Sequence, residues 1–415
     1  MDHPIFDYFP LFNIIAEFAG KAEIVAKIGK LNFAKQCIQN DLIDHKLLIK
    51  FACKFDRLDI MQYLNVNDKL TEFGTFYVTK YNNHKILTWM HKNVPIRYFN
   101  HDCDCNNYDY RGNLIDVAAD YGYLNIVKWM HRKRIGNCTI HAMDFAASSG
   151  HLEVVKFLHN NRTEGCTSDA MNWAAAYGHL EVIKWLHENR TEGCIIDAMN
   201  LAAAYGHLKV VKWLHRNCTE GCTTGAMYGA AEYGHLEVVK WLHRNRTEGY
   251  TTRAMDGAAE YGHLEVVKWL DRNRTEGCTS EAMDYAAENG HLKVVKWLHR
   301  NRTEGCTTAA MDYAASNGCL EVVKFLHINR TEGCTTDAMD FAAKFGHFNI
   351  IKFLHRNRTE GCTTAAMDSA AQNGHLKIVK FLHCNSLFNC NINSAFQLAI
   401  EHNQPHVVAY LQKFI

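Results

Sequence analysis

The chain has 415 residues, of which 47% are hydrophobic and 21% are charged. Its 45 lysines and arginines nearly balance 44 aspartates and glutamates, so the formal net charge is +1. Nucleic-acid-binding proteins usually carry a basic surplus, so this balance argues against nucleic acid as a partner. No stretch approaches 18 consecutive apolar residues, so we expect no membrane span and no membrane partner.

The first twenty residues are fairly apolar. However, Asp2 stands where a secretory signal would carry basic residues, and Glu17 interrupts the apolar run. We therefore expect no signal peptide, and we place the protein in the cytoplasm.

Weak copies of one helical pattern follow, within a degenerate N-terminal region that we assign to residues 1–112. They lie near residues 26–31, 51–64 and 83–90. A longer insertion at residues 93–113 separates these copies from a regular array at residues 113–384. Irregular terminal copies are expected where a repeat array meets water.

The regular array repeats every 28 residues, as the glycines from Gly122 to Gly374 show. In one copy, Thr279 or Ser280 is a suitable helix N-cap, and paired alanines permit close approach to a neighbouring helix. Gly290 is expected to end this first helix in a left-handed conformation. A second helix is predicted from Leu292 to near residue 301, with an apolar face of Val and Leu.

Neither helix of such a copy can bury its apolar face alone, but stacked copies can. An irregular copy at residues 385–415 closes the array. With the weak copies included, we expect an all-α solenoid of about fourteen helix pairs.

The repeated motif is Ala-Ala-x-x-Gly-His-Leu-x-Val-Val-Lys-x-Leu, found for example at residues 174–186, 230–242 and 258–270. It resembles the ankyrin repeat. The copies have 28 residues, about five fewer than the family's usual 33. The family's Thr-Pro-Leu-His start is also replaced, by residues 169–172. The resemblance implies a curved helix-turn-helix solenoid with shortened hairpin fingers.

Short repeats of this kind resemble the ankyrin proteins of amoebae and large DNA viruses, which would fit a virus–host interaction. The resemblance implies a monomeric scaffold that binds a protein partner, without catalysis or a cofactor. One alternative is an adaptor that recruits targets to a ubiquitin ligase through its N-terminal region. There the segment from Pro4 to Phe18 is a poor match to an F-box.

Cysteine recurs at one position of the repeat, and Tyr250 replaces it in a single copy. Adjacent layers about 9–10 Å apart cannot form disulfides between neighbouring copies without distortion. We therefore interpret these residues as small thiols in the connectors and expect them to be reduced. The cysteine ladder comprises Cys138, Cys166, Cys194, Cys222, Cys278, Cys306, Cys334, Cys362 and Cys390.

Histidine also recurs at two positions of the repeat. The first series follows the turn glycine, and the second series follows the second helix. One histidine per layer cannot complete a zinc site, so we expect the first series to form hydrogen bonds around the turn. The insertion offers the best metal candidates in the chain, His101, Cys103 and Cys105. A zinc-binding or redox protein is therefore a second alternative, although no fourth ligand is evident.

The end of the first helix varies between copies, and by resemblance it lines the concave face of the solenoid. Tyrosine is favoured at protein interfaces, although these rings could also serve only as packing. The neighbouring glutamates suggest a basic partner, and Arg253 lies at the start of one first helix. The candidate partner-binding residues are Tyr177, Tyr205, Tyr233, Tyr261, Glu232, Glu260, Glu288 and Arg253.

One further position ranges from glycine to tryptophan and is interpreted as a core position. Gly229 and Gly257 occupy it in the middle copies. We expect the space above them to be filled partly by Tyr233 and Tyr261, or else to open as a groove.

Overall fold

The computed structural model confirms an all-α repeat architecture. Within the part of the chain that it describes, the regular elements are helices, and no strand occurs. The 28 α-helices of this part form the fourteen pairs expected from the sequence. The structure describes residues 21–28, 31–40, 42–66, 73–99, 113–193, 196–249, 251–385 and 391–415.

The chain divides into two compact units, Met1–Ala198 and Met199–Ile415. A short 3₁₀ helix, η2 (Ile96–Phe99), follows the third pair of the first unit. The α-helices of the first unit are α2 (Lys21–Ile28), α3 (Leu31–Gln39), α4 (His45–Lys54), α5 (Leu58–Val66), α6 (Phe73–Lys80), α7 (His84–Asn93), α8 (Leu114–Asp120), α9 (Leu124–Lys133), α10 (His141–Ser148), α11 (Leu152–Asn161), α12 (Asp169–Ala176) and α13 (Leu180–Asn189).

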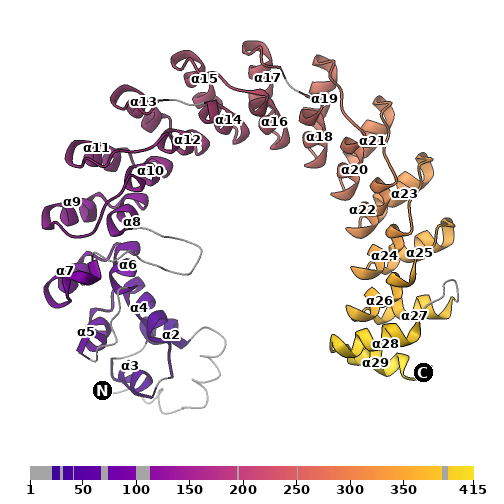
Figure 1. Ribbon diagram of the computed structural model, residues 1–415, viewed down its shortest axis with the longest axis horizontal. Coiled ribbons are helices and arrows are strands. Elements are labelled where there is room, and N and C mark those ends of the chain that lie inside the picture. Colours follow the sequence, from indigo (N-terminus) through magenta and orange to yellow (C-terminus); the bar gives the residue numbers. More distant parts are fainter. Residues whose placement is uncertain are drawn as a thin grey trace. The chain divides into compact units, whose positions relative to one another are not determined.

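The boundary between the units falls within α14, and the second unit continues the same pairing to the C-terminus (Figure 1). Its helices are α14 (Ile196–Ala204), α15 (Leu208–Asn217), α16 (Thr224–Glu232), α17 (Leu236–Asn245), α18 (Arg253–Glu260), α19 (Leu264–Asn273), α20 (Glu281–Glu288), α21 (Leu292–Asn301), α22 (Ala309–Ser316), α23 (Leu320–Asn329), α24 (Asp337–Lys344), α25 (Phe348–Asn357), α26 (Thr364–Gln372), α27 (Leu376–Cys384), α28 (Ile392–Glu401) and α29 (Pro405–Leu411).

The pair α20–α21 shows how the local sequence produces these elements. The Thr279 hydroxyl accepts a hydrogen bond of 3.2 Å from the backbone N–H of Glu281, so Thr279 caps α20. Gly290 then turns the chain with a φ of 74°, as predicted. Val295 and Leu298 of α21 are buried, and a fully buried side chain of this size contributes about 1.5–3 kcal/mol.

The turn glycine is required for space as well as for conformation. Gly262 has a φ of 79°, and a Cβ placed there would lie 2.6 Å from the ring Nδ1 of His291 in the next copy. The irregular copies use Asp56, Asn82 and Asn403 in the equivalent left-handed turns. Asp and Asn tolerate this conformation better than other side chains.

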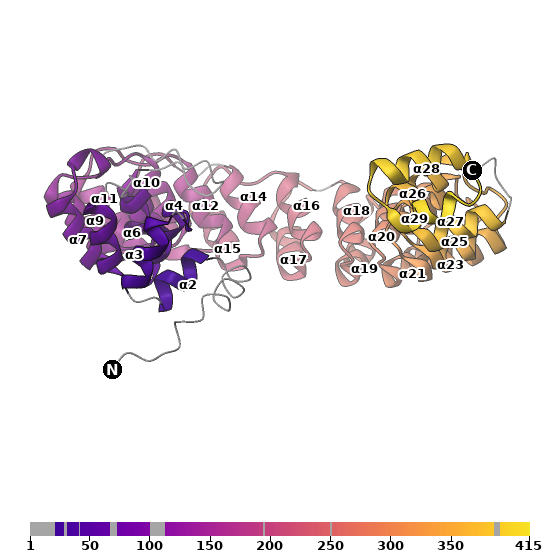
Figure 2. The ribbon, with the colours of Figure 1, turned by 90° about the horizontal axis from the view of Figure 1, so that it is seen from below.

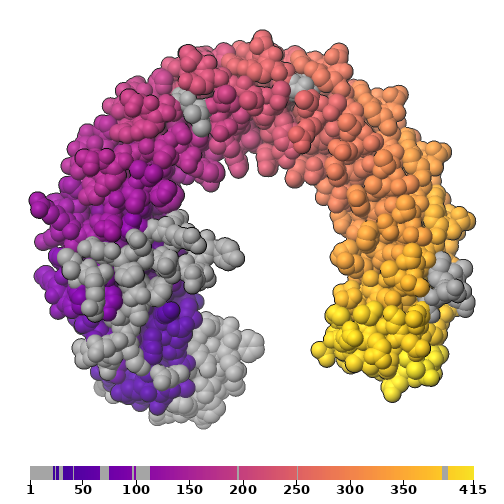
Figure 3. Space-filling view, in the orientation of Figure 1, coloured from indigo at the N-terminus to yellow at the C-terminus, as the bar shows by residue number. Residues whose placement is uncertain are grey.

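Successive first helices contact one another much more extensively than successive second helices do. The alanine pairs explain this difference, because they leave no bulk between neighbouring first helices. Within the second unit, the first helices therefore line the inner side of the curve and the second helices the outer side (Figure 1). Figure 2 shows α17, α19 and α21 following one another, and Figure 3 shows side chains filling the spaces between layers.

In six copies a buried aspartate in the first helix is hydrogen-bonded to the next copy. The Asp284 carboxylate accepts hydrogen bonds from the backbone N–H and the hydroxyl of Thr307, both at 2.8 Å. Asn200 makes the equivalent pair of bonds with Thr223. Similar bonds join Asp116, Asp144, Asp256, Asp312 and Asp340 to the threonine 23 residues later.

Candidate functional site

Three predicted tyrosines of the second unit lie together. Tyr205, Tyr233 and Tyr261 each follow the end of a first helix and are 48–49% exposed. The rings of Tyr205 and Tyr233 stack with their centroids 6.0 Å apart, and those of Tyr233 and Tyr261 are 6.2 Å apart. The tyrosines thus contact one another and still leave about half of each side chain for a partner.

The fourth predicted tyrosine, Tyr177, belongs to the first unit. It is 54% exposed, and its ring stacks on Trp173 with the centroids 6.2 Å apart. The first unit therefore carries its own exposed aromatic pair at the same position of the repeat.

The predicted glutamates end the first helices beside these tyrosines. Glu232, Glu260 and Glu288 are the last residues of α16, α18 and α20. None of the three forms an ion pair with a residue in the described ranges. We call Tyr205, Tyr233, Tyr261, Glu232, Glu260 and Glu288 the tyrosine–glutamate surface.

These carboxylates occupy an electrostatically unfavourable position. The C-terminal end of a helix carries partial negative charge, and a carboxylate there costs about 0.3–1 kcal/mol. Burial, then the charges of Glu232 and Glu288, raise the pKa of Glu260. The charge of Glu232 is also the main cause of the raised pKa of Tyr233. The surface therefore concentrates negative charge that the surrounding repeats do not neutralise.

Arg253, also predicted, lies at the start of α18 and contacts a tyrosine that we had not singled out. Its guanidinium carbon lies 5.9 Å from the ring centroid of Tyr228. Burial first, and then the carboxylate of Glu232, raise the pKa of Tyr228 to about 12. Tyr228 stands where other copies carry a buried Asp or an Asn, and its contact with Arg253 replaces that link.

The repeat position shared by Trp173, Gly229, Gly257 and Tyr313 was interpreted as core. This interpretation is wrong, because the large side chains at this position lie at the surface. Trp173 is 42% exposed and Tyr313 is 40% exposed. No groove forms above the two glycines either. A Cβ at Gly229 would lie 2.6 Å from that of Ala204, and one at Gly257 would lie 3.1 Å from the Tyr228 ring. Neighbouring residues, rather than Tyr233 and Tyr261, occupy the space.

The described members of the cysteine ladder carry free thiols, as expected. Burial is the main cause that raises the pKa of Cys278 to about 12 and of Cys306 to about 11. A thiol is a weak nucleophile and metal ligand at such a pKa. Cys194 and Cys390 lie outside the described residues. Cys218, which is outside the ladder and stands where other copies carry a connector arginine, is disulfide-bonded.

The turn histidines bond as predicted, and the bond reaches the preceding copy. Nε2 of His347 lies 2.9 Å from the carbonyl oxygen of Ser316, and Nε2 of His375 lies 3.1 Å from that of Lys344. Cys319 replaces a histidine in one copy, and its thiol donates to the Glu288 carbonyl at 3.7 Å. This series is therefore an inter-repeat link.

The second histidine series was expected after the second helix, but it lies in the last turn of that helix. Its rings pack edge-on against an aromatic ring of the next copy. His243 and Trp269 have their ring centroids 5.1 Å apart, and His355 and Phe381 have theirs 5.3 Å apart. Among the described residues, no group of three or more His, Cys, Asp or Glu could hold a metal ion. The zinc candidates His101, Cys103 and Cys105 lie outside those residues, as does the N-terminal segment considered for an adaptor.

The connectors form an ion-paired spine. Arg302 pairs with Glu304, lowering the pKa of that carboxyl, and its other guanidinium nitrogen lies 3.0 Å from the carboxylate of Asp271. Arg246 and Glu248 form the same internal pair.

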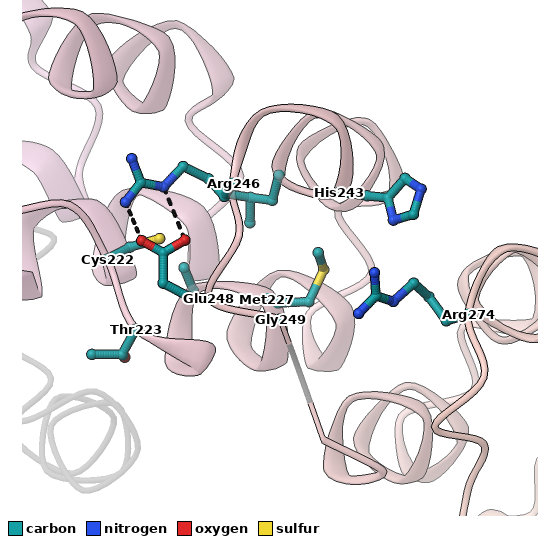
Figure 4. A pocket seen from close by; sticks show the side chains of 10 residues that line it. Cys222, Thr223, Met227, His243, Arg246, Glu248, Gly249 and Arg274 are labelled. Carbon is teal, nitrogen blue, oxygen red and sulfur yellow. Dashed lines mark hydrogen bonds and ion pairs between the residues drawn. The ribbon is translucent and has the colours of Figure 1, made fainter.

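A small pocket opens beside this spine in the second unit. Figure 4 shows Arg246 paired with Glu248 beside Cys222, with His243 and Arg274 on the other side of Met227. Equivalent connector residues recur in the other copies, so we interpret the pocket as part of the repeat structure.

Comparison with known families decides what these repeats are. A family model described as ankyrin repeats in three copies matches residues 115–200, 199–284 and 339–414. A second model, ankyrin repeats in many copies, matches residues 311–355. The matches cover more than half of the chain. The chain belongs to the ankyrin repeat family.

Ankyrin repeats imply a protein-binding scaffold, and the family is typically non-catalytic. No curated protein matches this ankyrin repeat chain significantly. No helix in the described ranges combines the length and the apolar character needed to span a membrane.

Proposed function

We propose that this ankyrin repeat protein is an interaction scaffold that holds its protein partner on the tyrosine–glutamate surface. The observation that supports this proposal is the row of Tyr205, Tyr233 and Tyr261, each about half exposed and supported by its neighbours. Tyrosine offers contact area and a hydroxyl while losing few rotamers on binding, which suits an interface.

The rigidity of the row adds to this support. Each tyrosine follows a first helix that is fixed to its neighbours by buried alanines. The rings are therefore held in place before a partner arrives, which reduces the entropy lost on binding. Tyr177 and Trp173 offer a comparable pair in the first unit.

The test is an affinity pull-down that compares the wild type with a triple variant, Tyr205→Ala, Tyr233→Ala and Tyr261→Ala. Tyr313→Ala combined with Phe345→Ala is the control, because these exposed aromatic residues lie in α22 and directly after α24. We expect the triple variant to lose a partner that the control retains. Equal capture by all three proteins would contradict the proposal, provided that circular dichroism shows folded variants.

We also propose that the protein works in a reducing compartment such as the cytoplasm. The free thiols of the described ladder cysteines support this location. The Cys218 disulfide is the exception. Counting free thiols in protein isolated from its native cells tests the proposal, since loss of the ladder thiols to oxidation would contradict it.

A further inference from the structure

We infer that the segment recognised by the tyrosine–glutamate surface is rich in arginine. This inference rests on the proposed function and names the chemistry of the partner. It depends on the position of the three carboxylates, on their lack of ion-pair partners among the described residues, and on an arginine of this chain that lies over the Tyr228 ring.

The carboxylates stand where the fold itself disfavours them. Glu232, Glu260 and Glu288 end three successive first helices, and the helix dipole favours a cation at that end. A later copy follows this preference with Lys344, the last residue of α24. Three acidic residues in succession therefore indicate a requirement other than stability of the repeat.

The charges of Glu232 and Glu288 act on Glu260, and no ion pair within the described residues offsets them. The pKa of Glu260 is raised by burial and by the charges of both neighbouring glutamates. The contrast with the second helices is direct. There Glu237 and Glu265 each pair with a lysine three residues later, at 2.7 and 2.8 Å. A cationic partner would give Glu260 and its neighbours the compensating positive charge that the lysines give to Glu237 and Glu265.

The chain contains an example of how such a cation is held. The guanidinium of Arg253 lies over the Tyr228 ring at 5.9 Å, and the Glu232 carboxylate is close enough to raise the pKa of the hydroxyl on that ring. A guanidinium can cover an aromatic face and also donate to a carboxylate, which a lysine ammonium does less well. Glu232–Tyr233 and Glu260–Tyr261 offer the same two groups, side by side in the sequence, to an arginine from outside.

Two alternative occupants fit this surface less well. An acidic segment would add charge of the same sign to the three glutamates, and an apolar segment would bury them without a partner. An arginine-rich segment can neutralise the carboxylates and use the exposed tyrosine rings in the same contact.

The test is fluorescence anisotropy with three labelled peptides of equal length, in which arginine, lysine or glutamate alternates with alanine. We expect the arginine peptide to bind most tightly and the glutamate peptide not to bind. A triple variant, Glu232→Gln, Glu260→Gln and Glu288→Gln, is expected to weaken arginine-peptide binding at least tenfold. Raising the salt concentration should also weaken it, because the surface is exposed.

The matched control is Glu237→Gln, Glu265→Gln and Glu321→Gln, which removes the same charge from second helices. It should bind the arginine peptide as the wild type does. Equal weakening by the two triple variants would overturn the inference, since net charge alone would then explain binding. Equal affinity for arginine and lysine peptides would overturn the assignment to arginine. Failure of every peptide would refute this inference only, because the pull-down with the tyrosine variant judges the proposed function separately.

Discussion

Asp312 accepts two hydrogen bonds from Thr335 of the next copy, one from the backbone N–H at 2.8 Å and one from the hydroxyl at 2.9 Å. Burial raises the pKa of the Asp312 carboxyl, while both bonds to Thr335 oppose that shift. The carboxylate thus joins successive copies at a buried point, where a missing acceptor cannot be replaced easily by water.

The first prediction concerns this link. Asp312→Ala leaves the Thr335 N–H without its acceptor and should destabilise the protein by about 1–3 kcal/mol. Asp312→Asn is the control suggested by the chain itself, because Asn200 bonds to Thr223 in the same way. Urea unfolding measures both variants. A loss as large for asparagine as for alanine would show that the charge, and not the pair of bonds, matters.

The second prediction concerns the copy in which Tyr228 replaces the aspartate. Tyr228→Asp leaves the surface above Gly257 bare, and Gly257→Tyr alone collides with the Tyr228 ring. The two changes together recreate the combination of Asp284 with Tyr313. We expect the double variant to be more stable than the two single effects predict, by about 1 kcal/mol.

A double-mutant cycle in urea measures this coupling. Amide hydrogen exchange at Thr251 provides a second readout, since an aspartate at position 228 would accept from that N–H. Strict additivity, or unchanged exchange at Thr251, would show that the ring and the missing link are independent.

The third prediction concerns the stability cost of the acidic surface. Glu260→Gln should raise the free energy of unfolding at pH 7 by about 0.5 kcal/mol, because it removes a charge from a helix C-terminus. The pKa of Glu260 is raised in the folded state, so its ionised form costs stability above that pKa. The cost disappears as the pH falls, so the advantage of the variant should vanish below about pH 4.

Thermal unfolding of the wild type and Glu260→Gln across this pH range provides the measurement. Glu265→Gln serves as the control, because it removes an ion pair with Lys268 and should not stabilise the protein. A stabilisation by Glu260→Gln that persists unchanged at acid pH would contradict the electrostatic explanation.

The fourth prediction compares two glycines. Gly262→Ala should destabilise the protein strongly, because its φ is 79° and the new Cβ would meet the His291 ring. Gly225→Ala lies in the first turn of α16, where the new Cβ would approach the Thr223 hydroxyl to 3.0 Å. Because Ala365 occupies the equivalent place beside Thr363, this variant should stabilise the protein by up to about 1 kcal/mol. Calorimetry of the two variants checks the opposite signs, and a shift in the same direction for both would contradict this account.

Much of the fold could be predicted from the sequence because the repeat makes each feature visible many times. The 28-residue spacing, the turn at Gly290 and the start of α21 at Leu292 agree with the structure. The buried aspartates could not be predicted in the same way. A carboxylate next to a methionine in a helix usually faces water, and the threonine that accommodates it lies 23 residues away.

The position of Trp173 and Gly257 was misinterpreted for a related reason. Large and small residues alternate there as they do in a core, and only the stacking of neighbouring copies shows that the position is at the surface. One feature of the sequence could have pointed to Tyr228. It stands at a repeat position where the other regular copies carry Asp or Asn. That a partner binds at the tyrosine–glutamate surface stays a prediction.

The inter-repeat bonds join partners at fixed separations, 23 residues for Asp312 and Thr335 and 31 for His375 and Lys344. Excising residues 313–340, one whole 28-residue period, would bring Thr363 to the place that Thr335 holds opposite Asp312. Unequal recombination within the gene could therefore shorten or lengthen the protein by complete periods without creating a foreign junction. The span available to a partner can then change in evolution while the chemistry of each layer stays the same.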